Sequence, residues 1–101
     1  MIDSIKRAAS GRWHEILGLN LQRDDHQGQP CPKSGGNDRF HVDREYRLNG
    51  TVYCRHCLPK GSGDGIGSYA WLHAIDNSEA IKRLAEELGM VPNIPMRQSL
   101  I

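Results

Sequence analysis

The chain has 101 residues, of which 38% are hydrophobic, and its 13 basic and 12 acidic side chains leave a formal net charge of +1. A chain of this length has room for one small domain with a marginal core, and its total charge gives no argument for a nucleic-acid partner. No apolar run approaches the roughly 18 residues of a membrane helix, and no apolar signal core follows the N-terminus. We therefore expect a soluble protein of cytoplasmic location.

Two short helices are expected at the N-terminus. Small and apolar side chains share one face of residues 3–10, Gly11 interrupts the pattern, and apolar side chains at helical spacing return over residues 12–17. Trp13, in the second of these helices, is expected to pack in the core. Residues 19–30 are mostly polar and are predicted to form a loop.

Three cysteines stand where a zinc ribbon places its ligands, and a serine stands at the fourth corner. Cys31 and Ser34 form one two-residue knuckle, and Cys54 and Cys57 form another after nineteen intervening residues. This is close to the four-cysteine zinc pattern, whose spacer is about 15–20 residues. An odd number of cysteines with a tight C-x2-C favours a metal over disulfides in a chain without a signal peptide. One structural zinc ion is expected, and three buried free thiols are the alternative.

The fourth zinc ligand has several candidates. Ser34 occupies the usual position, but a neutral hydroxyl is a weak zinc ligand. His26 precedes Cys31 by five residues, can reach the site through the intervening loop, and is our first choice. His41 and His56 are also near in the sequence, although His56 lies inside the second knuckle, where side chains point away from the ion. Water is the remaining alternative.

The middle of the chain is expected to form a β-hairpin. Residues 39–42 and 51–54 are rich in β-favouring side chains, and Asn49-Gly50 is a hairpin-turn signal. Residues 46–48 are predicted to supply the strand that leads into this turn. The last strand then ends at Cys54, as in a zinc ribbon.

The C-terminal part contains two predicted helices after a glycine-rich turn. The first runs over residues 65–75 with Asp64 as its N-cap, and the second runs over residues 79–88 with Ser78 as its N-cap. The glycine-rich turn is not a phosphate-binding P-loop, because no GK[ST] follows it.

The expected fold is a small α+β domain, a zinc ribbon made of a β-hairpin with two knuckles and flanked by short helices. Its expected segments are an N-terminal helical part (1–18), the zinc ribbon (19–60), a C-terminal helical part packed on the ribbon (61–90), and a linker or disordered tail (91–101).

The basic side chains are concentrated in the ribbon. From residue 33 to residue 60 six Lys or Arg side chains stand against three acidic ones. Guanidinium groups can hold phosphates while an aromatic ring stacks on an unpaired base. The candidate DNA-binding residues are Lys33, Arg39, Arg44, Tyr46, Arg47 and Arg55. Tyr46 is expected to be the exposed ring and Phe40 to lie in the core; a merely solvated basic face is the alternative.

Four stretches of the chain resemble one known family, in the same order. They are GRWHEIL (11–17), PCPKSGGNDRF (30–40, preceded by His26), TVYCRHC (51–57) and GSGDGI (61–66). Together they resemble the N-terminal zinc-ribbon domain of phage- and plasmid-type DNA primases and primase–helicases, over about residues 8–88. The one clear departure is Ser34, where that family has a second cysteine. The departure leaves the fold expectation intact and puts in doubt how the zinc is held.

The resemblance implies a role in DNA replication. In such primases the zinc domain helps to recognise the single-stranded template for RNA primer synthesis, and it works beside a catalytic domain and often a helicase. The acidic metal site of the catalytic domain is not evident, so the chain is expected to be a non-catalytic module or fragment of a primase. Two alternatives are a zinc ribbon that docks a polymerase or helicase partner through residues 79–88, and a part of a primer-synthesising enzyme without independent function.

Overall fold

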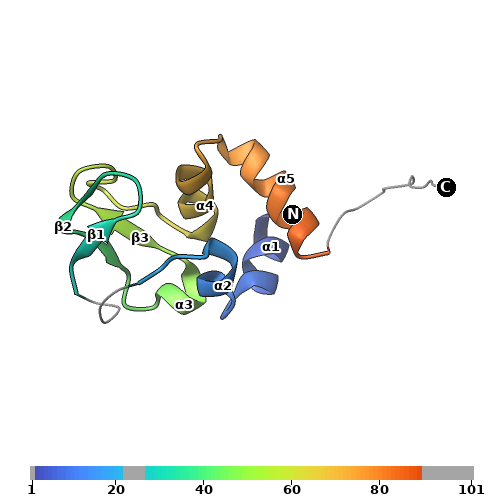
Figure 1. Cartoon of the computed structure of the whole chain (residues 1–101). Coiled ribbons are helices and arrows are strands. Elements are labelled where there is room, and N and C mark those ends of the chain that lie inside the picture. Colours follow the sequence, from blue (N-terminus) through green and yellow to red (C-terminus); the bar gives the residue numbers. More distant parts are fainter. Residues whose placement is uncertain (1, 22–26, 90–101) are drawn as a thin grey trace.

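The computed structural model describes residues 2–21 and 27–89. A small sheet lies at one end of the molecule and helices lie at the other, with α2 and α3 between them (Figure 1). The elements in chain order are α1 (Ile2–Ala9), α2 (Trp13–Leu17), β1 (Gln29–Cys31), β2 (Gly35–Val42), α3 (Tyr46–Asn49), β3 (Val52–Cys54), α4 (Gly65–His73) and α5 (Asn77–Glu87). No helix in the described ranges has the length and apolar character needed to cross a bilayer.

The sheet is antiparallel, with strand order β1-β2-β3. Strands β2 and β3 pair with Phe40 opposite Cys54 and Val42 opposite Val52. These four side chains are buried, because alternate residues of a strand face the same side of the sheet and this side faces the helices. The expected small α+β zinc-ribbon fold is therefore confirmed.

Two details of the ribbon differ from the sequence-based expectation. Gln29–Cys31, predicted to be the end of a loop and the first residue of a knuckle, is a strand that pairs with β2. Residues 46–48, predicted to be a strand, belong to the one-turn helix α3, so β2 and β3 are not joined by a tight Asn-Gly turn. The link between the strands is a longer segment, residues 43–51.

Side-chain hydrogen bonds explain why this link is helical. The Asp43 carboxylate accepts from the main-chain N–H of Glu45 at 3.0 Å and from the Asn49 side-chain amide at 3.1 Å. Gly50 then ends the helix in the left-handed conformation (φ 73°), and its N–H donates to the carbonyl of Tyr46. Asn-Gly fits the end of a helix as well as a hairpin turn, because both require positive φ.

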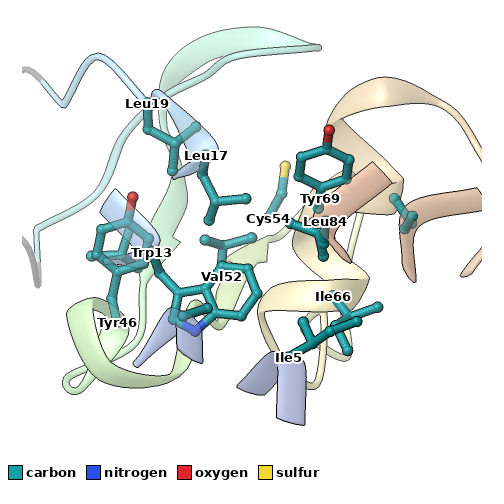
Figure 2. Packing of buried hydrophobic residues seen from close by; sticks show 14 of the residues in the cluster. Ile5, Trp13, Leu17, Leu19, Tyr46, Val52, Cys54, Ile66, Tyr69 and Leu84 are labelled. Carbon is teal, nitrogen blue, oxygen red and sulfur yellow. The ribbon is translucent and has the colours of Figure 1, made fainter. Parts of the chain in front are cut away.

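The core joins the ribbon to the helices. Trp13, Tyr46 and Val52 are fully or almost fully buried together with residues of α1, α4 and α5 (Figure 2). The indole of Trp13 lies so close to the backbone of Gly50 and Gly65 that a Cβ at either glycine would overlap it. Trp13 is therefore a core residue, as expected.

The two C-terminal helices are confirmed, with one correction at a cap. Asp64 caps α4 by accepting from the N–H of Gly67 at 2.8 Å, as predicted. Helix α5 is capped by Asp76, which accepts from the N–H of Glu79 at 2.8 Å, and not by Ser78, which lies inside the first turn. The helix starts earlier because Asp is as good an N-cap as Ser. Residues 91–101, predicted to be a tail, lie outside the described residues.

Candidate metal centre

The fold brings the three cysteines together. Cys31 ends β1, Cys54 ends β3, and Cys57 follows Cys54 in the second knuckle. Their three Sγ atoms all lie within 4.8 Å of one another. Cys31 and Cys54 are buried and Cys57 is half-buried, and no disulfide links them. Among the described residues, this is the group of His, Cys, Asp and Glu side chains close enough to share a metal ion.

Main-chain N–H groups of both knuckles point at the sulfurs. The N–H groups of Lys33 and Ser34 donate to Cys31 Sγ at 3.4 and 3.3 Å, and the N–H of Cys57 donates to Cys54 Sγ at 3.3 Å. Such bonds favour the thiolate over the thiol, because they stabilise the negative charge. The local turns thus prepare the sulfurs to act as metal ligands.

The pKa values of two of the thiols move in opposite directions. Burial raises the pKa of Cys54, but main-chain N–H donors and the neighbouring side chains outweigh it and bring the pKa to about 7. For Cys57, the Ser34 hydroxyl lowers the pKa, but burial and the two other thiols outweigh it, so the pKa is raised. Thiolates held this close together repel one another's negative charge. A divalent cation relieves that repulsion.

The chemistry of this donor set fits zinc. Three clustered cysteine sulfurs are soft ligands, and Zn–S bonds of about 2.3 Å bring three thiolates around one ion in tetrahedral geometry. Cys31, Cys54 and Cys57 are the residues that would hold it. The ion would cross-link β1 to the end of β3 and so fix the shape of the sheet.

Ser34 lies at the fourth corner of the cluster. Its Oγ is 3.9 Å from Cys54 Sγ, and it accepts a hydrogen bond from the Arg39 guanidinium at 3.4 Å. The expectation that Ser34 occupies the place of a fourth ligand is consistent with this geometry.

The histidine candidates do not join the cluster in the described part of the chain. His41 lies on β2 and contacts the ring of Tyr53, with the ring centroids 5.8 Å apart. His56 lies inside the second knuckle and is exposed. Neither belongs to the group of side chains that can share a metal ion. His26, our first choice from the sequence, lies outside the described residues.

The candidate DNA-binding Lys and Arg side chains differ in their contacts within the chain. The Lys33 ammonium donates to the main-chain carbonyl of Trp71 at 2.6 Å and lies 5.5 Å from the centre of its ring. Arg55 pairs with Asp38 at 3.0 Å, and both side chains are largely exposed. Arg39 is half-buried against Ser34, whereas Arg44, in the turn before α3, and Arg47, within α3, are exposed.

The expectation that Tyr46 is an exposed ring is wrong. Tyr46 is 0% exposed, because α3 turns its side chain into the core, where its hydroxyl meets His14 Nδ1 at 3.2 Å. Phe40 is buried, as expected. The exposed aromatic ring of the ribbon is Tyr53, 36% exposed. The signal for it was the alternation of Val52, Tyr53 and Cys54: once Cys54 faces the core, Tyr53 must face outward.

Comparison with known proteins finds a family that is similar to this part of the chain. Residues 26–66 match the family described as the zinc-binding domain of primase-helicase. The matched segment contains both knuckles, all three strands and the one-turn helix between β2 and β3. No solved structure matches the chain.

Proposed function

We propose, from the premise that residues 26–66 are a zinc-binding domain of the primase-helicase family, that this chain is the DNA-binding module of a DNA primase. In this proposal it holds the single-stranded template for RNA primer synthesis during replication. The observation that carries the proposal is the composition of the open face of the sheet. The zinc ion supplies rigidity there, and the contacts come from the chain itself.

The open face of β2 and β3 combines aromatic and basic side chains. His41 and Tyr53 are paired across the two strands, on the side opposite the buried Phe40 and Cys54. Arg55 comes two residues after Tyr53, and its N–H donates to the carbonyl of Arg39 at 2.8 Å. The Arg39 guanidinium itself is directed at Ser34. Exposed rings stack on unpaired bases, and neighbouring guanidinium groups hold phosphates.

The ion pair on this face does not block a phosphate. Arg55 and Asp38 are 62% and 66% exposed in their side chains, so their attraction is weakened by water and salt. The Arg55 hydrogen bond and charge lower the pKa of Asp38, which therefore stays ionised at neutral pH. A backbone phosphate carries one negative charge, like the carboxylate, and offers Arg55 a bidentate partner in its place.

The other basic residues are proposed as flanking contacts. Arg44 and Arg47 are exposed in the segment that links β2 to β3, and Lys33 lies at the first knuckle. Such residues add sequence-independent attraction to the DNA backbone and position the strand.

The docking alternative receives less support. Its proposed surface was the apolar side of residues 79–88, but Ala80, Leu84 and Ala85 are buried against the other helices. The large apolar side chains exposed in the described ranges are Ile2, Leu48 and Tyr53, none of which is on α5. We propose instead that primase catalytic and helicase parts act beside this module.

Titration of labelled single-stranded DNA of mixed sequence, followed by fluorescence anisotropy, tests the proposal. Tyr53→Ala should weaken binding by about 5- to 150-fold, because base–aromatic stacking contributes about 1–3 kcal/mol per base. Tyr53→Phe is the matched control and should bind like wild type, since it keeps the ring.

The salt dependence of binding tests the phosphate contact. Arg55→Ala should reduce the slope of log binding constant against log salt concentration by about 0.7, and Lys82→Ala on α5 should not. Failure of the zinc-loaded protein to bind at low salt, or equal binding by Tyr53→Ala, rules the proposal out.

A further inference from the structure

We propose that the Ser34 hydroxyl oxygen is the fourth zinc ligand of this chain, and that Arg39 holds it in place. The inference concerns the metal centre and does not depend on DNA binding. It assigns a role to the position at which this chain departs from a four-cysteine pattern. The distance from Ser34 to the cluster supports it, and so do the hydrogen bond, the charge and the packing of Arg39.

Ser34 Oγ lies at nearly the distance from Cys54 Sγ that a fourth zinc ligand requires. A tetrahedral centre with Zn–S bonds of about 2.3 Å and a Zn–O bond of about 2.0–2.2 Å separates the sulfur and the oxygen by about 3.6 Å. Ser34 Oγ lies 3.9 Å from Cys54 Sγ. The main chain of Ser34 is fixed by the same cluster, because its N–H donates to Cys31 Sγ at 3.3 Å. The oxygen is therefore about 0.3 Å farther from Cys54 Sγ than a zinc ligand would be.

Hydrogen-bond stereochemistry leaves one lone pair of Ser34 available. A serine hydroxyl has one proton and two lone pairs, whereas a guanidinium group only donates. Arg39 Nη1 donates to Oγ at 3.4 Å and therefore uses one lone pair. The other side of the oxygen faces the sulfurs, where a metal ion can use the second lone pair.

The charges also match this arrangement. Three thiolates around a divalent ion leave one net negative charge, and a neutral hydroxyl adds none. The positive charge of Arg39, half-buried beside Ser34, balances it. A charge buried near a metal centre is costly unless it is paired. With a fourth thiolate the centre would carry two negative charges, and one guanidinium would not neutralise it.

Gly36 provides the space for Arg39. A Cβ built on Gly36 would overlap the Arg39 guanidinium, whereas a Cβ on Gly35 meets nothing within 4 Å. Both glycines have positive φ, 80° and 74°, so an alanine at either position carries a similar backbone strain. A comparison of Gly36→Ala with Gly35→Ala therefore separates the effect of displacing Arg39 from the effect of backbone strain in the turn.

The absorption spectrum of the cobalt-substituted protein tests directly which groups bind the metal. With Co²⁺ in place of zinc, Ser34→Cys should raise the thiolate-to-cobalt absorbance per metal by about a third, because three thiolates become four. Ser34→Ala should open the fourth position, so that added azide shifts the cobalt bands of Ser34→Ala but not those of wild type. His26→Ala should leave the wild-type cobalt spectrum unchanged.

The following spectroscopic results would contradict the proposal that Ser34 is the fourth ligand. If azide shifts wild type and Ser34→Ala alike, water holds the fourth position. If azide shifts neither, another protein group fills that position. If His26→Ala changes the cobalt bands, or X-ray absorption of the zinc protein shows three sulfurs and one nitrogen, that ligand is a histidine.

Zinc competition with a chromophoric chelator tests the supporting role of Arg39. Arg39→Met should weaken zinc binding by about 10- to 100-fold, the usual effect of losing a residue that orients a ligand. Gly36→Ala should approach that loss, and Gly35→Ala should fall clearly short of it. Circular dichroism of each zinc-loaded variant checks the fold. Unchanged affinity in a folded Arg39→Met protein, or equal losses in the two glycine variants, contradicts the role.

Discussion

Asp43 shows how one side chain decides the conformation of the link between β2 and β3. Its carboxylate accepts from the N–H of Glu45 and from the amide of Asn49, and these bonds lower its pKa below the ordinary value. A carboxyl group with a lowered pKa in the folded state contributes stability above its unfolded pKa and loses it as the pH falls through the folded one. At neutral pH the contribution of Asp43 is therefore complete.

Asp43→Ala should lower the free energy of unfolding by about 0.5–1.5 kcal/mol at pH 7, because two local hydrogen bonds are lost. Asp43→Asn keeps a carbonyl acceptor for the N–H of Glu45 and should lose less. Urea denaturation of the zinc-loaded proteins measures both. An Asp43→Ala protein as stable as wild type would show that the helix forms without this side chain.

At the scale of single residues, the sequence predicted the metal site better than the surface. The spacing of Cys31, Cys54 and Cys57 sufficed to predict the cluster, because each knuckle is a short local turn. The exposure of Tyr46 was not predictable from its neighbours, since it depends on whether that segment is a strand or a helix. A strand would leave Tyr46 free to face outward, whereas α3 turns it into the core.

Elements with a sequence signal of their own were predictable, and elements that depend on their contacts were not. The sequence indicated α1 and α5 from apolar side chains at helical spacing, and α4 from its Asp64 N-cap. It missed β1, because a three-residue strand containing a proline has no pattern of its own and exists through pairing with β2. It also missed α3, because Asn-Gly fits two different structures.

The start of α5 offers a test of capping at the scale of one element. Asp76 Oδ1 accepts from the N–H of Glu79, whereas Ser78 lies in the first turn and is exposed. Asp76→Ala should therefore destabilise the protein by about 1 kcal/mol, and Ser78→Ala by a few tenths at most. Thermal unfolding monitored by circular dichroism compares them. A larger loss for Ser78→Ala would place the cap where the sequence first suggested it.

At the scale of the molecule, the metal centre and the helices share one core. The buried cluster includes Cys31 and Cys54 of the metal centre together with Leu84 of α5. The N-cap of α4, Asp64, also pairs with Lys6 of α1 at 3.1 Å. Trp13 connects these parts, because its ring lies against the backbone where the segment after α3 and the start of α4 approach each other.

This junction depends on the absence of side chains at Gly50 and Gly65. Gly65→Ala should destabilise the protein by about 1–3 kcal/mol, although alanine is the better helix former, because the new Cβ overlaps the Trp13 ring. Gly65 is the more informative position, since Gly50 also has positive φ and an alanine there would add backbone strain.

A double-mutant cycle with Trp13→Phe separates the overlap from any other effect of the new methyl group. The smaller ring leaves room for the Cβ, so Gly65→Ala should cost less in the Trp13→Phe background than in wild type, with a coupling of about 0.5–3 kcal/mol. Urea unfolding followed by far-ultraviolet circular dichroism suits all four proteins, because it does not rely on Trp13 fluorescence. Additive losses would mean that the Trp13 ring does not limit the approach of α4 to the ribbon.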